Sequence, residues 1–401
     1  MIVTIKKSTA SGTVAAPPSK SMAHRALICA ALSDGSQVEN IEYSNDISAT
    51  LNCLLSLGAK TEKSDDKIKI GGLNPFSLKS ATIDCRESGS TLRFLIPLCM
   101  LSGEKITLTG SNRLFERDLS IYEEIAGQND MVFKTKENSL TVCGKLKSGD
   151  YKIRGNISSQ FISGLLFALP LLEGDSSLII IGEYESEPYV NLTVKTLNDF
   201  GVKIQRCGRE YKIKGNQRYL PKKTTVEGDY SNAAFLDGFN LLGGNVRVTG
   251  LNTTSLQGDK VYVDMYNDLK SGKRRFDLSN CPDLAPVMFA LSAVNGGACF
   301  TGTKRLKIKE SDRAIAMKQE LLKFGIRLDV GENDVTVHSG ILKFPTETLC
   351  GHNDHRIVMA LSLLCSVVGG SISEAESVAK SYPDYFSKIK SLGIVIENEI
   401  R

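Results

Sequence analysis

Segments made almost wholly of apolar helix-forming residues recur along the chain, and each follows a short polar cluster. In the first, residues 26–32 follow a cluster that begins with two prolines, which exclude a helix upstream. We expect Ser19 or Ser21 to accept the unpaired N–H groups of the first turn. Lys20 and Arg25 add positive charge where the helix dipole is already positive. The pattern therefore predicts a helix whose N-terminus attracts anions.

The same order of polar cluster, apolar helix, glycine-containing turn and β-rich strand occurs six times. The copies begin roughly 70 residues apart, except for a shorter fourth copy, and a regular period is typical of a repeat architecture. A single hydrophobic core stops growing near roughly 250 to 300 residues. We therefore expect two domains of three units each.

A second, amphipathic helix is predicted within the copies. Its apolar residues recur at helical spacing in residues 47–58, 190–201, 314–325 and 383–393, and each segment ends at a glycine that suits a left-handed C-cap. The strand that follows often alternates, as in residues 67–70, so one face of its sheet is expected to be exposed. The apolar first helix is then the buried one.

The two domains are expected to be joined by a two-stranded hinge near residues 17–19 and 226–229. One domain comprises residues 1–17 and 227–401, and the other comprises residues 18–226. The N-terminal strand at residues 2–6 is expected to return to the C-terminal domain. Two similar lobes that point helix N-termini at a cleft suggest closure on anionic ligands, and a self-contained cleft of this kind predicts a monomer.

Composition limits the possible partners. The chain has 401 residues, 41% of them hydrophobic and 23% charged, and no apolar run approaches the roughly 20 residues of a membrane span. We expect no signal segment, and ten cysteines without a Cys-x-x-Cys pair predict reduced core residues in a cytoplasmic protein. A formal charge of +4 without arginine-rich tracts argues against nucleic acid as a partner. Small anionic ligands fit better, because the cations occur one or two at a time in the motifs.

Several kinds of chemistry are disfavoured. His352 and His355 have the spacing of a metal pair, but no further ligand cluster accompanies them, so we expect no metal. The chain has four histidines in all, which argues against a Ser-His-Asp hydrolase. Neither a Gly-x-x-x-x-Gly-Lys-Ser/Thr loop nor Gly-x-Gly-x-x-Gly is present, which argues against a nucleotide-dependent kinase or dehydrogenase.

The densest charged stretch is residues 307–313, which we predict to be the end of a strand that runs into a helix. Alternation places Lys307 and Lys309 on one face of that strand. Ser311 or Asp312 is expected to cap the helix that starts near Arg313.

At these motifs the chain resembles the EPSP synthase family, the 3-phosphoshikimate 1-carboxyvinyltransferases. The resemblance covers essentially the whole chain, and its blocks are Ser19-Lys20-Ser21 with Arg25, Ser158-Ser159-Gln160, Lys309-Glu310-Ser311-Asp312-Arg313, Asn353-Asp354-His355-Arg356 and residues 379–386. It implies an α/β (α+β) fold of two similar lobes. Each lobe would contain three βαβαββ repeats with buried helices, the inside-out α/β barrel of enolpyruvyl transferases.

The resemblance also implies a reaction of aromatic amino acid biosynthesis. The enolpyruvyl group of phosphoenolpyruvate would pass to the 5-hydroxyl of shikimate 3-phosphate through a tetrahedral ketal, with release of phosphate and without metal or cofactor. The residues that would bind shikimate 3-phosphate are Lys20, Ser21, Arg25, Ser158, Ser159, Gln160, Ser186, Tyr189, Asp283 and Lys309. Those that would bind phosphoenolpyruvate are Lys20, Gly89, Arg117, Gln160, Arg313, Arg356 and Lys380.

Charge balance supports this distribution independently. The two substrates bring roughly five to six negative charges, and at a separation of about 4 Å each like-charge pair costs on the order of 4 kcal/mol at an effective dielectric of about 20. The predicted lysines and arginines nearly balance that charge. We assign Asp283 as the base for the hydroxyl proton and Glu310 as the acid for the methylene carbon, and Lys20 as an aid to the departing phosphate. The exchange of roles between the two carboxylates stays open.

Two alternative functions fit the sequence less well. The sister enzyme that acts on UDP-N-acetylglucosamine starts with Lys-Asn where this chain has Lys20-Ser21, and it usually carries a reactive cysteine in the loop that corresponds to residues 110–118, which has none here. A non-catalytic anion-binding or RNA-binding repeat protein has no need of Asp283 together with Glu310. The resemblance to the family at Gly89 implies competitive inhibition by glyphosate.

Overall fold

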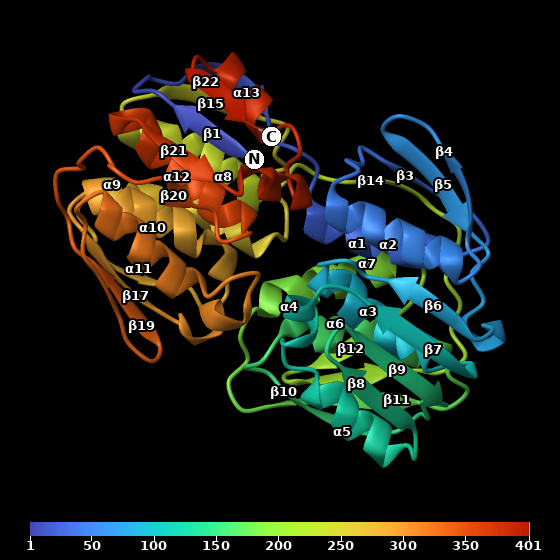
Figure 1. The fold of residues 1–401 in the computed structure, drawn as a ribbon. Coiled ribbons are helices and arrows are strands. Elements are labelled where there is room, and N and C mark those ends of the chain that lie inside the picture. Colours follow the sequence, from blue (N-terminus) through green and yellow to red (C-terminus); the bar gives the residue numbers. More distant parts are fainter. Residues whose placement is uncertain (401) are drawn as a thin grey trace. The chain divides into compact units, whose positions relative to one another are not determined.

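The computed structural model describes residues 1–400, and the chain divides into two compact units (Figure 1). Unit 1 comprises Met1–Pro17 and the chain from Gly228 onward, and unit 2 comprises Pro18–Glu227. The chain therefore crosses between them after Pro17 and after Glu227, the latter one residue later than expected. Within residues 1–400, no helix combines the length and apolarity needed to cross a membrane.

Unit 2 contains three four-stranded sheets, and its second repeat gives the pattern in its complete form. The order along the chain is β6 (Ala81–Asp84), α3 (Gly89–Cys99), β7 (Gly103–Thr109), the short α4 (Asn112–Phe115), α5 (Ser120–Gln128), β8 (Val132–Lys136) and β9 (Ser139–Gly144). The strands lie side by side in the order β6-β7-β9-β8, with β6 and β7 parallel and the other pairs antiparallel (Figure 1). Apart from α4, this is a βαβαββ unit.

The other repeats of unit 2 follow the same plan. The third contains β10 (Asp150–Arg154), α6 (Ser159–Ala168), β11 (Ser176–Ile181), α7 (Glu187–Asp199), β12 (Ile204–Cys207) and β13 (Glu210–Ile213). The first contains α1 (Lys20–Ala31), β3 (Ser36–Glu39), α2 (Asn45–Ser56), β4 (Lys60–Lys63) and β5 (Lys67–Gly71). Its missing first strand is supplied by β14 (Lys223–Thr225), which pairs in parallel with β3.

Unit 1 contains two full repeats. One consists of β16 (Arg275–Asp277), α10 (Ala285–Val294), β17 (Ala298–Thr301), α11 (Arg313–Lys323), β18 (Leu328–Val330) and β19 (Asp334–Val337). The other consists of β20 (Leu349–Cys350), α12 (His355–Val368), β21 (Gly370–Ser373), α13 (Tyr385–Ser391), β22 (Ile396–Ile400) and β1 (Ile2–Ile5). Because β1 pairs antiparallel with both β21 and β22, the expected return of the N-terminal strand is confirmed.

The fourth repeat is shortened, as its sequence predicted. It contains β2 (Ser11–Ala15), α8 (Tyr230–Gly238), β15 (Asn245–Thr249) and α9 (Tyr262–Lys270), and its sheet consists of β2 and β15 only.

The first helix of each repeat lies in the core. Nine residues in succession are buried in α10, from Ala285 to Ala293, and α6 and α12 are buried almost as completely. A helix that is apolar on all sides is stable only when it is surrounded by protein. The predicted wet sheet face is also present, because Ile68 and Ile70 of β5 are buried while Lys67 and Lys69 are exposed.

Two local predictions are wrong. The segment Lys304–Ile308 is a 3-10 helix, η6, so the placement of Lys307 and Lys309 by strand alternation fails. The preceding strand ends at Thr301, because Gly302 has φ of 71° and turns the chain away. Ser19 occupies the N-cap position of α1, but its hydroxyl forms no capping bond and is buried without a hydrogen-bond partner among residues 1–400.

Candidate functional site

Four helices of unit 2 begin at predicted site residues. Helix α1 begins at Lys20 and α3 begins at Gly89. Helix α6 follows the N-cap residue Ser158, whose hydroxyl accepts from the N–H of Gln160, and α7 follows Ser186. Because each helix start presents unpaired N–H groups and the positive end of a dipole, these four positions favour anions.

Arg25 contacts two other predicted residues in unit 2, Ser21 and Tyr189. Its Nη1 donates to the carbonyl of Ser21 at 2.6 Å and its Nη2 to the carbonyl of Tyr189 at 2.9 Å. Its Nε donates to Thr193 Oγ1 at 2.8 Å. These acceptors are neutral, and burial lowers the pKa of Arg25 to about 10. A buried guanidinium held by neutral acceptors retains its full charge for an anionic ligand such as a phosphate.

Gly89 lies at a wall formed by polar side chains. A Cβ at this position would lie 2.9 Å from Arg117 Nη1, 3.2 Å from Arg93 Nη1 and 3.7 Å from Gln160 Oε1. Gln160 accepts from Arg93 Nη1 at 2.9 Å and donates to Ser90 Oγ at 3.0 Å. The structure therefore brings Gly89, Arg117 and Gln160 together.

Arg93 and Asp46 were not predicted as site residues. Arg93 is 4% exposed and lies one helical turn after Gly89, so the four-residue spacing could have revealed it. Asp46, in the first turn of α2, accepts from Lys20 Nζ at 2.8 Å, and both side chains are largely buried. Its position just after the cap residue Ser44 was the available signal.

In unit 1, Asp283 is the centre of a second group. Its carboxylate accepts from Arg313 Nη1 at 2.8 Å, Arg356 Nη2 at 2.9 Å and Lys309 Nζ at 3.3 Å. Glu310 accepts from Arg313 Nη2 at 2.8 Å. All five residues were predicted. They come from the 3-10 helix η5 (Pro282–Leu284), the segment between η6 and α11, and the starts of α11 and α12.

The surrounding charges set the ionisation of this group. Burial by itself raises the pKa of Asp283, but the positive charges of Arg356, Lys309 and Arg313 outweigh burial and hold this pKa well below its ordinary value. Burial lowers the pKa of Lys309, although the charge of Asp283 opposes that effect. Asp283 is therefore ionised at neutral pH.

Asp354 holds the guanidinium of Arg313 beside the Asp283 group. This carboxylate is fully buried and accepts from Arg313 Nε at 2.9 Å and from Ser311 Oγ at 3.1 Å. It also caps α12 by accepting from the N–H of Arg356 at 2.9 Å. Asp312 caps α11, as predicted, by accepting from the N–H of Ile315 at 3.2 Å. Asp354 was quoted within a motif but given no role, although its position before a helix was the signal.

Lys380 reaches the start of α12 from the end of the 3-10 helix η7 (Ala375–Lys380). Its Nζ donates to the carbonyl of Asn353 at 2.5 Å, and the residue is 8% exposed. The neighbouring His352 contacts Glu320 at 3.0 Å. Among residues 1–400, no group of three or more His, Cys, Asp or Glu residues could hold a metal ion.

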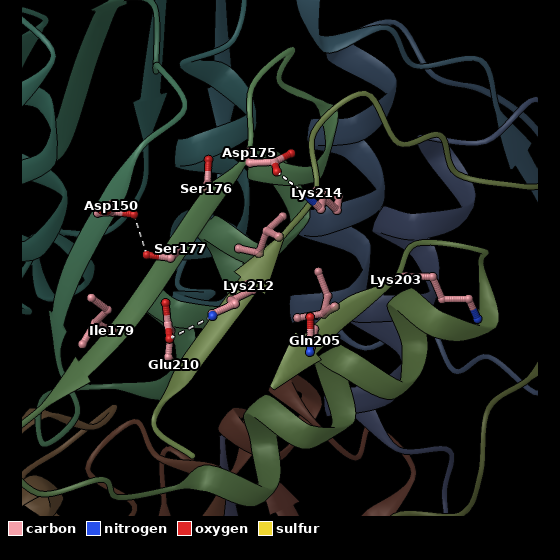
Figure 2. Close-up of a pocket in the computed structure, with 12 residues that line it drawn as sticks. Asp150, Asp175, Ser176, Ser177, Ile179, Lys203, Gln205, Glu210, Lys212 and Lys214 are labelled. Carbon is pink, nitrogen blue, oxygen red and sulfur yellow. Dashed lines mark hydrogen bonds and ion pairs between the residues drawn. The ribbon is translucent and has the colours of Figure 1, made fainter. Parts of the chain in front are cut away.

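A cavity of about 600 Å³ lies elsewhere, over the sheet β10-β11-β13-β12 (Figure 2). Two of its lysines have acidic partners, because Lys214 contacts Asp175 at 2.5 Å and Lys212 contacts Glu210 at 3.9 Å. None of the predicted site residues lines it. This cavity is therefore not the candidate site.

Comparisons with known proteins agree with the motifs. The profile of the family EPSP synthase (3-phosphoshikimate 1-carboxyvinyltransferase) matches residues 5–389. The 3-phosphoshikimate 1-carboxyvinyltransferase of Clostridium kluyveri is 42% identical over 419 residues, which cover 98% of this chain and 97% of the relative. That of Clostridium beijerinckii is 41% identical and covers 96% of both chains. A solved structure of EPSP synthase from Acinetobacter baumannii has a TM-score of 0.80 at 20% identity and covers 99% of both chains.

Proposed function

This chain belongs to the EPSP synthase family, and we propose that the side chains gathered in its two units bind the two anionic substrates of the family reaction. That reaction transfers the enolpyruvyl group of phosphoenolpyruvate to the 5-hydroxyl of shikimate 3-phosphate. The observation that carries the assignment of catalytic residues is the ionised Asp283, which is held by three cations next to Glu310.

Shikimate 3-phosphate is assigned mainly to unit 2. Arg25 holds its charge on neutral acceptors, so the 3-phosphate is a better partner than any that Arg25 has in the free protein. The helix starts supply further N–H donors and hydroxyls. The assigned residues are Lys20, Ser21, Arg25, Ser158, Ser159, Gln160, Ser186 and Tyr189, with Asp283 and Lys309 from unit 1.

Phosphoenolpyruvate is assigned to residues of both units. In unit 2, the guanidinium of Arg117 lies beside the bare backbone of Gly89, which leaves room for a small anion. In unit 1, Arg313, Arg356 and Lys380 are assigned to the same substrate. Lys20 and Gln160 complete the set.

The charges around Asp283 suggest how a weak base gains strength. In the free protein its pKa is depressed by Arg356, Lys309 and Arg313. When a substrate anion binds those cations, their charge is compensated and the pKa of Asp283 rises. The carboxylate then becomes able to accept the proton of the 5-hydroxyl.

The steps balance with two carboxylates. Asp283 takes the hydroxyl proton as the oxygen bonds to C2 of phosphoenolpyruvate, and Glu310 gives a proton to C3 to form the ketal. Glu310, now a carboxylate, takes a proton back from the new methyl group while phosphate departs with the help of Lys20. The proton held by Asp283 passes to the departing phosphate, so the double bond is restored and both carboxyl groups return to their starting states. The reverse assignment, with Glu310 as the base, is the alternative.

We further propose that the protein acts as a cytoplasmic monomer without metal or cofactor, and without a nucleic-acid or membrane partner. The small net charge of +4 supports the absence of a nucleic-acid partner.

Phosphate release tests this function. The wild-type protein is assayed with phosphoenolpyruvate and either shikimate 3-phosphate or UDP-N-acetylglucosamine, in chelator-treated buffer. We expect phosphate release when shikimate 3-phosphate is the acceptor and none when UDP-N-acetylglucosamine is the acceptor. We expect Glu310→Gln to abolish this release. Glu332→Gln is the matched control, because Glu332 is an exposed partner of Lys304 in the same unit. No release with either acceptor would overturn the proposal, and release with the sugar nucleotide alone would assign the sister reaction.

A further inference from the structure

Four buried polar side chains form a continuous hydrogen-bond chain between three helices of unit 2. His24 Nδ1 on α1 lies 2.7 Å from Thr50 Oγ1 on α2. Thr50 Oγ1 lies 2.6 Å from Thr91 Oγ1 on α3, and Thr91 Oγ1 donates to Ser88 Oγ at 2.7 Å. Each of the four residues is at most 1% exposed. An apolar core would hold three helices together equally well. The burial of this hydrogen-bond chain therefore calls for a reason other than helix packing.

Counting protons fixes the direction of the chain. Thr91 uses its one hydroxyl proton on Ser88, so it accepts from Thr50. Thr50 has then used its only proton, so it accepts from His24, which must carry its proton on Nδ1. Burial, helped by the charges of Lys20 and Arg25, holds the pKa of His24 well below its usual value of 6.5. The imidazole is therefore neutral.

The far nitrogen of the ring has no competing partner. His24 Nε2 is buried without a hydrogen-bond partner among residues 1–400, and the ring meets Phe94 edge to face at 6.4 Å. Thr50 is consequently the one group that sets the tautomer of His24.

Both ends of the chain lead to residues assigned to phosphoenolpyruvate. His24 lies one turn after Lys20 on α1, and Thr50 lies one turn after Asp46 on α2. The bonds Lys20–Asp46 and His24–Thr50 are therefore successive ties between the same two helices. At the other end, Ser88 caps α3 by accepting from the N–H of Thr91 at 3.2 Å, and the next residue is Gly89.

We infer that His24 is a positioning residue for phosphoenolpyruvate: through Thr50, Thr91 and Ser88 it fixes the first turn of α3, and with it the Gly89 wall, relative to Lys20. This inference rests on the proposed roles of Lys20 and Gly89. Each hydrogen bond has a narrow range of lengths and angles, so the chain restricts sliding between helices more sharply than apolar contact does.

The test compares two substitutions of His24. His24→Leu keeps most of the volume and removes the donor, and we expect the KM for phosphoenolpyruvate to rise about tenfold, which is the usual effect of one lost hydrogen bond. The KM for shikimate 3-phosphate should stay within about threefold, since Arg25 and its partners do not belong to the chain. His24→Asn restores an N–H near the position of Nδ1, so it should return the KM for phosphoenolpyruvate to within about twofold of wild type.

Thr50→Val gives a second route to the same readout, and it serves if His24→Leu does not fold. Because both changes break one chain, the double variant should resemble the more affected single variant in its KM for phosphoenolpyruvate. Asn129→Leu is the matched control. Asn129 is buried in the same unit and bonds Ile125, Lys147 and Tyr151, so its loss should lower Tm without a selective change in KM.

Three results would overturn the positioning role. The first is wild-type kinetics in both His24→Leu and Thr50→Val, and the second is an equal change in the KM values for phosphoenolpyruvate and shikimate 3-phosphate that His24→Asn does not reverse. The third is additive effects of the two substitutions in the double variant. An inactive wild-type protein would instead overturn the proposed function, and the inference would fall with it.

Discussion

The Asp283 carboxylate lies among more positive charge than it can neutralise. Arg356, Arg313 and Lys309 all donate to it, and Arg313 also donates to Glu310 and Asp354. In the free protein Asp283 thus occupies donors that we assign to the substrates. Substrate binding in unit 1 is then an exchange of one anion for another, which limits affinity but leaves Asp283 free to act.

Asp283→Asn separates these two roles. Without the carboxylate, Arg356, Lys309 and Arg313 each lose one negatively charged partner, so phosphoenolpyruvate should bind at least as tightly as in wild type. The base is lost at the same time, and kcat should fall by about 10² to 10⁴. Calorimetric titration and steady-state kinetics measure the two effects, with Asp329→Asn, an exposed carboxylate beside Arg327, as control. Loss of phosphoenolpyruvate binding would show that Asp283 organises the cations rather than competing for them.

Gly89→Ala tests the wall next to Arg117. The added Cβ would meet a guanidinium nitrogen at 2.9 Å, so Arg117 must shift and the room for a small anion shrinks. We expect the KM for phosphoenolpyruvate to rise about tenfold and inhibition by glyphosate to weaken further, because one misplaced contact costs about 1 to 3 kcal/mol.

The matched control for this substitution is Gly127→Ala. Gly127 lies in α5, where a Cβ meets nothing within 4 Å, so kinetics should be unchanged and stability slightly raised. Unaltered glyphosate inhibition in Gly89→Ala would remove Gly89 from the site.

At the scale of helices, two capping aspartates of unit 1 differ in depth. Asp312 caps α11 with one bond at a partly exposed position, whereas Asp354 is fully buried, caps α12 and pairs with Arg313. Asp312→Ala should cost about 1 kcal/mol, as typical cap losses do. Asp354→Ala leaves a buried guanidinium short of a partner and should cost about 3 to 5 kcal/mol. Urea unfolding of both variants measures the difference, and equal losses would show that only the caps matter.

His24 predicts how the stability of α1 and its neighbours depends on pH. Its pKa in the folded protein lies well below the ordinary 6.5, so the unfolded chain binds the proton first as pH falls. The contribution of neutral His24 to the free energy of unfolding is therefore fully present above about pH 6.5. It is lost on acidification, by up to about 1.4 kcal/mol per pH unit.

His24→Asn should flatten this part of the stability profile, because Asn does not titrate. Tm measured from pH 5 to pH 8 in both proteins gives the comparison, and the difference isolates His24 from the other groups that titrate in this range. Parallel profiles would mean that His24 has the same pKa in the folded and the unfolded protein.

The sequence predicts elements better than it predicts partners. The buried α10 and the amphipathic α11 follow from hydrophobic period alone, since an apolar helix needs a core and a one-sided helix needs a surface. Residues 304–308 were misassigned because alternation over so few residues fits a short 3-10 helix as well as a strand. Helical spacing and cap position could have marked Arg93 and Asp46 as candidates, but their partners Gln160 and Lys20 lie on other helices, and such contacts depend on tertiary packing that no local pattern records.

At the scale of the whole chain, each unit is completed by a segment remote in sequence. In unit 2, β14 supplies the first strand of the first repeat, about 200 residues after that repeat begins. In unit 1, β1 supplies the last strand of the last repeat. The return of β1 was predicted because it precedes the first crossing, whereas β14 was not, since three residues carry too little pattern. Unit 1 is therefore built from two separate stretches of the chain, whereas unit 2 is one contiguous stretch whose two ends meet in one sheet.

Hydrogen exchange in the presence of substrates tests whether both units serve one reaction. The assigned residues for phosphoenolpyruvate include Lys20 and Gly89 of unit 2 and Arg313 and Arg356 of unit 1. If both sets bind one substrate pair, shikimate 3-phosphate and phosphoenolpyruvate together should slow exchange at the first turns of α1 and α3 and also at those of α11 and α12. Shikimate 3-phosphate alone should act mainly on α1, α6 and α7. The end of α5, which carries no assigned residue, is the internal control. Protection confined to one unit under all conditions would mean that the other unit's cations serve a separate ligand, because a bound substrate slows exchange wherever the residues that hold it lie.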